Sequence, residues 1–297
     1  MTFVLAHVSD PHLAPLPQPR LIELIGKRAT GYVNWRRKRQ AIHQAEVLAR
    51  IVADLKAQRP DHIAVTGDLV NLALPREYQT ARAWLDALGA PADVTLVPGN
   101  HDAYVRSGVA ASLTHWGEFM RGDEGAAVSG FPFLRRRGPL ALIGVSTSVP
   151  SLPLFAIGRV GAHQLQRLEK ILDDSAREGL YRVVLIHHPP TSKPSHYLKR
   201  LTDGARLRDV LARHGAELVI HGHNHRRQTV WLDGPAGRIP AIGVPSASEA
   251  PPGEHDPAGY NLYRIDGARD AWRCEVITRG MTNDGVVELD KTVLKSR

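Results

Sequence analysis

Apolar and polar positions along the chain follow two alternating patterns, which together predict an α/β fold. Short apolar runs, rich in residues that favour strands, alternate with longer stretches that have the spacing of amphipathic helices. The strand-like runs are 3–8, 62–66, 93–97, 182–186 and 217–221, and the helix-like stretches lie near 40–58, 76–88, 103–120, 161–178 and 203–213. Strands separated by such helices indicate βαβ units and a largely parallel sheet.

A second group of strand-like runs has few helices between its members. These runs are 131–136, 139–146, 226–232, 238–244, 260–266 and 271–278. They predict a second sheet, mixed or antiparallel. We find no linker between the two groups, so we expect one domain over residues 1–297, with two sheets and helices outside. The C-terminal part, 245–297, is expected as a strand and loop extension that begins with a Pro/Gly-rich surface loop, 245–259.

Five of the apolar runs stop at side chains that can bind a metal ion. The segments that follow them are Asp10-Pro11-His12, Gly67-Asp68, Gly99-Asn100-His101-Asp102, His187-His188 and Gly222-His223-Asn224-His225. In open α/β sheets, ligand sites form outside the carboxyl ends of the strands. We therefore expect groups far apart in sequence to converge in one crevice, and we expect the glycines to allow sharp turns and close backbone approach there.

The candidate ligands are two carboxylates, one Asn carbonyl and four imidazoles, without a thiolate. This set argues against a structural zinc site. Imidazole with carboxylate suits iron, manganese, zinc or cobalt. There are more ligands than one metal needs, which favours two metal ions that share a carboxylate. Such pairs, roughly 3.5–4 Å apart, clamp the attacking and leaving oxygens of a displacement at phosphorus.

In their order, these motifs resemble the calcineurin-like metallophosphoesterase superfamily. Its blocks are Asp-x-His, Gly-Asp, Gly-Asn-His-Asp or Glu, His, and Gly-His-x-His, and this chain carries all of them between residues 10 and 225. The context around the first and fourth blocks is similar to that of bacterial class III cyclic-nucleotide phosphodiesterases. The resemblance implies a two-sheet β-sandwich flanked by helices, the calcineurin-like αββα fold.

The resemblance also implies a role for each residue. One metal ion would take Asp10, His12, Asp68 and His225, and the other would take Asp68, Asn100, His187 and His223, so that Asp68 bridges. A hydroxide between the metals would attack phosphorus. His101 would assist the leaving oxygen as hydrogen-bond donor or general acid, and Asp102 is expected to orient His101. The implied function is hydrolysis of phosphodiesters such as cyclic nucleotides or other small phosphodiesters.

A basic insert at about 18–40 leaves the substrate open. The chain has a formal charge of +8, and residues 20–39 hold seven cationic side chains against Glu23 alone, a net charge of +6. Basic residues interleaved with Leu21–Ile25, Tyr32 and Trp35 suit an anionic membrane surface, although a solvated helical face fits equally well. An alternative substrate is therefore a lipid-linked or UDP-linked phosphoanhydride. Nucleic acid is less favoured, because we identify no aromatic stacking platform.

The remaining features restrict the class of protein. The N-terminus reads as neither a signal peptide nor a membrane span, and Cys274 is the only cysteine, which rules out an internal disulfide. We expect a cytoplasmic protein, with peripheral contact to the membrane and a homodimer left open. A metal-binding scaffold without activity is the non-enzyme alternative. It is disfavoured because such proteins are expected to lose ligands, and here every ligand is present.

Overall fold

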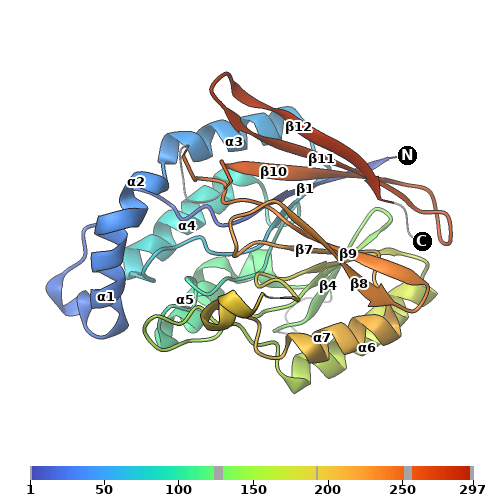
Figure 1. Ribbon diagram of the computed structural model, residues 1–297, viewed down its shortest axis with the longest axis horizontal. Helices are drawn as coiled ribbons and strands as arrows, with labels where there is room; N and C mark the ends of the chain where they lie inside the picture. Colours follow the sequence, from blue (N-terminus) through green and yellow to red (C-terminus); the bar gives the residue numbers. More distant parts are fainter. Residues whose placement is uncertain (1, 124–129, 192, 251–255, 295–297) are drawn as a thin grey trace.

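Two six-stranded β-sheets pack face to face, with helices on both outer sides (Figure 1). The computed structural model describes residues 2–123, 130–191, 193–250 and 256–294. The first sheet has the order β12 (Gly285–Leu294), β11 (Arg273–Thr282), β10 (Gly259–Asp266), β1 (Phe3–Val8), β2 (His62–Val65) and β3 (Val94–Leu96). The second has the order β4 (Phe133–Arg137), β5 (Leu140–Gly144), β6 (Tyr181–Leu185), β7 (Leu218–His221), β9 (Gly237–Gly243) and β8 (Gln228–Gly234).

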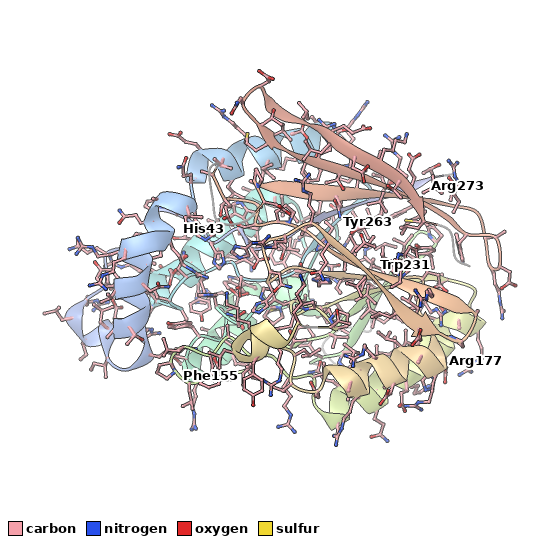
Figure 2. All side chains as sticks on the ribbon, in the orientation of Figure 1. His43, Phe155, Arg177, Trp231, Tyr263 and Arg273 are labelled. Atoms are coloured by element: carbon pink, nitrogen blue, oxygen red, sulfur yellow. The ribbon has the colours of Figure 1, made fainter. Side chains whose placement is uncertain are left out.

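Three apolar clusters fill the spaces between the four layers. The first lies between the first sheet and the helices α3 (Ala45–Ala57), α4 (Pro75–Leu88) and α5 (Arg106–Trp116). The second lies between the second sheet and the helices α6 (Ala162–Arg177) and α7 (Gly204–His214). The third lies between the sheets and includes Leu5 and Tyr263, the latter labelled in Figure 2. The αββα arrangement that the sequence predicts is thus present.

Strand β1 shows why the central strands are apolar on both faces. Leu5 belongs to the cluster between the sheets, whereas Ala6 and Val8 face the helices. Alternate side chains of a strand point to opposite faces, so a strand in an inner layer needs apolar residues at nearly every position. Such runs look alike in either sheet, and they do not reveal which strands are neighbours.

The predicted division of strands between the sheets is therefore wrong. The five strands expected in one parallel sheet are split: β1, β2 and β3 run parallel in the first sheet, and β6 and β7 run parallel in the second. Each group is completed by strands from the other predicted set, such as β10, which pairs antiparallel with β1. Strand β12 was not predicted, and most of its residues are exposed.

The split still brings the metal-binding motifs together. Strands β1 and β2 end side by side in the first sheet, and β6 and β7 do so in the second. Because the sheets face each other, hydrogen bonds cross between their strand ends. Nδ1 of His187 lies 2.6 Å from the carbonyl oxygen of Thr66, and the backbone N–H of His223 donates to Oδ2 of Asp10 over 3.0 Å.

The basic insert forms a helical arm at one end of the molecule (Figure 1). It consists of the 3-10 turn η1 (Leu21–Leu24), the helix α1 (Lys27–Asn34), the π-helical turn η2 (Trp35–Arg39) and the short helix α2 (Gln40–Ile42). Trp35 is only 8% exposed and packs with Leu16, Leu72 and Leu74 in a separate small cluster. The arm is therefore anchored on the body. No helix in the described ranges is both long and apolar enough to cross a membrane.

Candidate metal centre

The first group of candidate ligands gathers where β1 and β7 end. Nε2 of His225 lies 3.3 Å from Oδ1 of Asp10 and 3.3 Å from Nε2 of His12. One ligand atom from each of these three residues falls within 4.8 Å of the others, and all three side chains are buried. Two imidazoles and a carboxylate thus point at one spot, as the sequence predicts.

The second group lies beside the first and is joined to it by Asp68. Oδ2 of Asp68 lies 3.4 Å from Nε2 of His187 and 3.8 Å from Nε2 of His12, so that it faces both groups. Nε2 of His187 lies 3.1 Å from Oδ1 of Asn100 and 3.3 Å from Nδ1 of His223. The structure therefore brings all the predicted ligands to one place.

Each imidazole is turned so that one nitrogen faces the protein and the other faces the centre. Nδ1 of His187 meets the Thr66 carbonyl, Nδ1 of His12 lies 3.3 Å from the Val70 carbonyl, and Nδ1 of His225 lies 3.2 Å from Oε2 of Glu249. For His223 the roles are exchanged, since Nε2 lies 2.8 Å from the Lys199 carbonyl. Oxygen acceptors at the outer nitrogen fix the proton there and leave the inner lone pair for a metal.

Backbone strain is concentrated at the same residues. Nine non-glycine residues in the described ranges have positive φ, and five of them are candidate ligands: Asp10 (+50°), His12 (+36°), Asp68 (+57°), His223 (+71°) and His225 (+51°). Each such conformation costs on the order of 1–3 kcal/mol and persists only where the surroundings enforce it. Strain collected on the polar residues at the strand ends is typical of a functional site.

Two glycines leave room for the ligand side chains. A Cβ atom built on Gly99 would overlap the Asp68 carboxylate, and one built on Gly222 would overlap Ser9 and the carboxylate of Asp10. Any other residue at these positions would push a candidate ligand out of place. The predicted role of the glycines at the strand ends therefore has a direct steric basis.

The electrostatics of the centre favour added positive charge. Burial alone would raise the pKa of Asp68, but the facing His187 lowers it. Burial lowers the pKa of His225, yet the nearby Asp10 carboxylate outweighs this and raises it to about 9. Oδ1 of Asp10 is buried and accepts no hydrogen bond from any described residue. Imidazole lone pairs and carboxylate oxygens that converge in this way fit metal ions.

The expected pairing of Asp102 with His101 is wrong. The Asp102 carboxylate accepts hydrogen bonds from four backbone N–H groups, those of Asp68 (2.9 Å), Leu69 (2.9 Å), Val70 (3.2 Å) and Gly99 (2.8 Å). It is fully buried, and Nδ1 of His101 meets the Asn71 carbonyl oxygen instead. The physical reason is that the turns after β2 and β3 leave these N–H groups without other acceptors. Asp102 therefore ties the two ligand-bearing loops together.

His101 has different partners from those expected. Its Nδ1 lies 2.6 Å from the Asn71 carbonyl oxygen, and its Nε2 lies 2.9 Å from Nη1 of Arg39, in the basic insert. Its ring stacks on Tyr104, with centroids 5.5 Å apart. Both ring nitrogens therefore meet protein groups, although a ligand atom of His101 also lies within 4.8 Å of ligand atoms of His12 and Asp68.

The stretch after β9 contributes residues that sequence reasoning missed. Residues 245–250 were expected in a surface loop, but they are buried, while 251–255 lie outside the described residues. Glu249 reaches His225, and the Ser246 hydroxyl donates to the Asp10 carbonyl oxygen over 2.6 Å. His43 also lies here (Figure 2), with its ring centroid 4.5 Å from that of His12. Nothing in the local pattern marks these residues.

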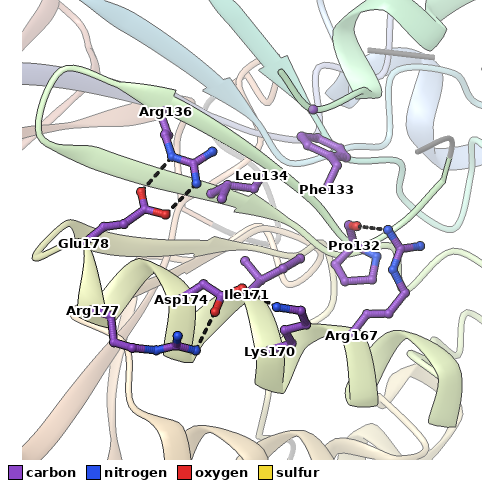
Figure 3. Close-up of a pocket in the computed structure, with 11 residues that line it drawn as sticks. Pro132, Phe133, Leu134, Arg136, Arg167, Lys170, Ile171, Asp174, Arg177 and Glu178 are labelled. Atoms are coloured by element: carbon purple, nitrogen blue, oxygen red, sulfur yellow. Dashed lines mark hydrogen bonds and ion pairs between the residues drawn. The ribbon is translucent and has the colours of Figure 1, made fainter. Parts of the chain in front are cut away.

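A separate pocket of about 520 Å³ lies between β4 and α6 and contains none of these residues (Figure 3). Arg167 donates to the carbonyl oxygens of Phe131 and Pro132, and the other charged side chains are paired with one another. Arg136 meets Glu178 at 2.7 Å, and both Lys170 (2.7 Å) and Arg177 (2.6 Å) meet Asp174. The pocket therefore offers little unpaired charge to a ligand, and the chemistry of the molecule is concentrated at the strand ends.

Residues 3–227 match the family model of the calcineurin-like phosphoesterases, and the chain belongs to that family. It is a metal-dependent phosphoric ester hydrolase. The matched region includes every candidate ligand and His101.

Two curated relatives are phosphodiesterases by name. The chain is 26% identical over 282 residues to a probable cyclic nucleotide phosphodiesterase of Synechococcus. The aligned region covers 93% of this chain and 92% of that protein. A 56-residue segment, 18% of this chain and 19% of the relative, is 48% identical to the glycerophosphodiester phosphodiesterase GpdQ of Enterobacter lignolyticus.

Solved structures with the same fold include two phosphatases. A dimetal phosphatase from Danio rerio aligns with a TM-score of 0.62 at 14% identity, over 99% of both chains. A purple acid phosphatase from yellow lupin aligns with a TM-score of 0.59 at 14% identity, over 99% of this chain and 53% of its own. At this identity the likeness concerns the fold.

Proposed function

We propose that this protein is a two-metal phosphodiesterase. The position of Asp68 between the two ligand groups carries the proposal, because a shared carboxylate is how two ions are held close enough to act on one phosphorus. The proposed ligands of the first ion are Asp10, His12, Asp68 and His225, and those of the second are Asp68, Asn100, His187 and His223. The ligand set accepts iron, manganese, zinc or cobalt.

The chain's own residues prepare the site for this reaction. Two bound cations would supply an activated water for attack on phosphorus and neutralise the charge that develops on the phosphoryl oxygens. The carbonyls of Thr66 and Val70 and the carboxylate of Glu249 fix the imidazoles beforehand, so that little reorganisation is needed. His101, at the edge of the centre, is proposed to contribute to turnover rather than to bind metal.

A small phosphodiester is the proposed substrate class. Both curated relatives are named as phosphodiesterases, one probable and acting on cyclic nucleotides and the other on glycerophosphodiesters. The first relative covers nearly the whole chain, which supports a cyclic nucleotide as the first compound to test.

The test is a panel of phosphoesters assayed with defined metals. Purified protein is stripped of metal, reloaded with Mn²⁺, Fe²⁺, Zn²⁺ or Co²⁺, and assayed on cyclic nucleotides, glycerophosphodiesters and monoesters. We expect diesters to be hydrolysed faster than monoesters, and about two ions bound per chain. Asn100→Ala and His223→Ala should each remove one ion. A single ion in the wild-type protein, or faster turnover of monoesters, would contradict the proposal.

A second candidate function is favoured by the surface around the site. The insert leaves Leu21 (89%), Ile22 (73%) and Ile25 (73%) strongly exposed, and Leu152 (72%) and Leu154 (87%) are exposed in a neighbouring loop. The two segments are joined because Nζ of Lys27 donates to Oγ of Ser151 over 2.9 Å. Apolar tips beside exposed arginines suit an anionic lipid surface. The corresponding substrate is a lipid-linked or UDP-linked phosphoanhydride.

Vesicle sedimentation separates the two candidates. We expect the wild-type protein to bind phosphatidylglycerol vesicles more than phosphatidylcholine vesicles, and a Leu21→Ser/Ile22→Ser/Ile25→Ser variant to lose this binding. Leu289→Ser, which changes an exposed leucine of β12, serves as the control. Equal, negligible binding of all the variants would remove the second candidate and leave the first unchanged.

A further inference from the structure

Arg39 is the residue of the basic insert that reaches the candidate metal centre. The arm presents Trp35 to the body of the protein, and Arg39 lies four residues later, on the same side of the helical turn. Its guanidinium contacts His101 across 62 residues of sequence. Arg36 and Arg37, on the same turn, are exposed. One arginine of the run is thus directed inward.

The contact with His101 has a defined direction. A guanidinium can only donate hydrogen bonds, so Nε2 of His101 must accept from Nη1 of Arg39. A carbonyl oxygen can only accept, so Nδ1 of His101 carries the proton that it donates to Asn71. In this arrangement His101 offers no proton toward the centre. The donors that remain beside it belong to Arg39.

Most N–H groups of the Arg39 guanidinium are available to a ligand. Its only hydrogen-bonding partner among the described residues is His101, which leaves Nε and Nη2 without an acceptor there. It is partly enclosed and within electrostatic range of Asp68 and Asp10. By contrast, Lys27 is occupied by the loop at Ser151 and Phe155. A fixed guanidinium with free N–H groups is suited to phosphoryl oxygens.

We propose that Arg39 is a substrate-binding residue that donates hydrogen bonds to an oxygen of the phosphoryl group, and that His101 holds its guanidinium in position. The inference rests on the proposed phosphoesterase function of the centre. It gives the basic insert a part in the reaction, because the arm completes the site with a cation that the five motifs do not contain. His101 is then a positioning residue that acts through Arg39.

Inorganic phosphate is the probe that tests whether Arg39 binds the phosphoryl group. Its affinity for the metal-loaded protein is measured by calorimetric titration for wild type, Arg39→Met, Arg39→Lys, Arg36→Met and Arg37→Met. We expect Arg39→Met to weaken binding by roughly 10- to 100-fold, since charge-assisted hydrogen bonds are lost. Arg39→Lys should restore part of the affinity, because it keeps the charge without the fork.

The two control variants show whether a loss of phosphate binding is specific to Arg39. Arg36→Met and Arg37→Met remove the same charge from the exposed side and should stay within about twofold of wild type, as screened surface charges do. Equal losses at all three positions would reduce the effect to net charge and overturn the proposal. So would an Arg39→Met protein with unchanged metal content that binds phosphate like wild type. These titrations need no turnover, so the proposal can fail while the phosphodiesterase function stands, and the reverse.

The proposal that His101 positions Arg39 is tested by a double-mutant cycle on kcat/KM for a diester with a poor leaving group. If His101 acts through Arg39, His101→Ala should add little to the loss already caused by Arg39→Met. Losses that multiply would show that His101 acts independently and would overturn this half of the proposal.

Discussion

Replacing Asp102 by asparagine tests whether this carboxylate serves the framework or the chemistry. Each of its oxygens accepts two backbone hydrogen bonds. Oδ2 accepts from Asp68 and Gly99, and Oδ1 accepts from Leu69 and Val70. An asparagine of the same shape keeps one oxygen and turns an NH₂ group toward the other two donors.

The expected loss of stability follows from the number of hydrogen bonds that the substitution removes. Two hydrogen bonds to a charged acceptor disappear and leave two N–H groups buried without a partner. Hydrogen bonds to charged groups contribute about 1.5–3 kcal/mol each, so we expect Asp102→Asn to lower the free energy of unfolding by roughly 3–6 kcal/mol. That is a large share of the 5–15 kcal/mol or so that stabilises a typical domain. Metal affinity should fall as well, because Asp68 and Asn100 lie on the loops that Asp102 joins.

The assay is urea unfolding followed by tryptophan fluorescence, with and without metal, together with kcat of the metal-saturated enzyme. Asp86→Asn is the control, because Asp86 is an exposed carboxylate paired with Arg82 and should change stability by less than about 1 kcal/mol. A catalytic Asp102 would give the opposite pattern. An Asp102→Asn protein that unfolds like wild type, binds metal normally and loses only turnover would mean that our interpretation of the four hydrogen bonds is wrong.

Three further predictions concern the ligands and their supports. Glu249→Gln removes the charge facing Nδ1 of His225 and should weaken metal binding by roughly 10- to 100-fold, measured by metal titration. His101→Ala should keep both ions but lower turnover, because the Arg39 guanidinium loses the side chain that positions it; full activity would contradict this role. Mn²⁺ at about a hundredfold excess over its dissociation constant should stabilise the wild-type protein by roughly 2.7 kcal/mol per site, read as a higher Tm. His223→Ala should show a smaller rise, and an equal one would exclude His223 as a ligand.

The candidate ligands could be predicted from the sequence because of where they lie on the strands. Each motif follows an apolar run at once, so its position is set by where a parallel strand ends. Asp10 and His187 come from different sheets, and the motifs nevertheless converge because the sheets face each other. The assignment to sheets was not predictable, since strands apolar on both faces look the same in either layer.

A sequence motif does not determine the direction in which each of its side chains points. His101 and Asp102 are adjacent in sequence, which suggested a pair, but successive residues in a turn point different ways. The Asp102 side chain enters the protein toward backbone N–H groups, and His101 faces the insert. Glu249 was hidden for a related reason, because its stretch is rich in proline and glycine and only the packed structure shows that it is buried.

The basic insert shows that a charge pattern can be correct and still incomplete. The run from Arg36 to Arg39 identifies a cationic segment, but charge alone does not say which side chain turns inward. The spacing of each residue from a buried side chain on the same helical turn does indicate which side chain turns inward. Trp35 is the one residue of this turn with a large apolar side chain, and a residue four positions later shares its helical face. With Trp35 buried, that rule places Arg39 rather than Arg36 or Arg37 on the inner face, and it ties the inward cation to the anchoring of the whole arm. A Trp35→Ala variant should therefore weaken phosphate binding through Arg39, although residue 35 is four positions away from it.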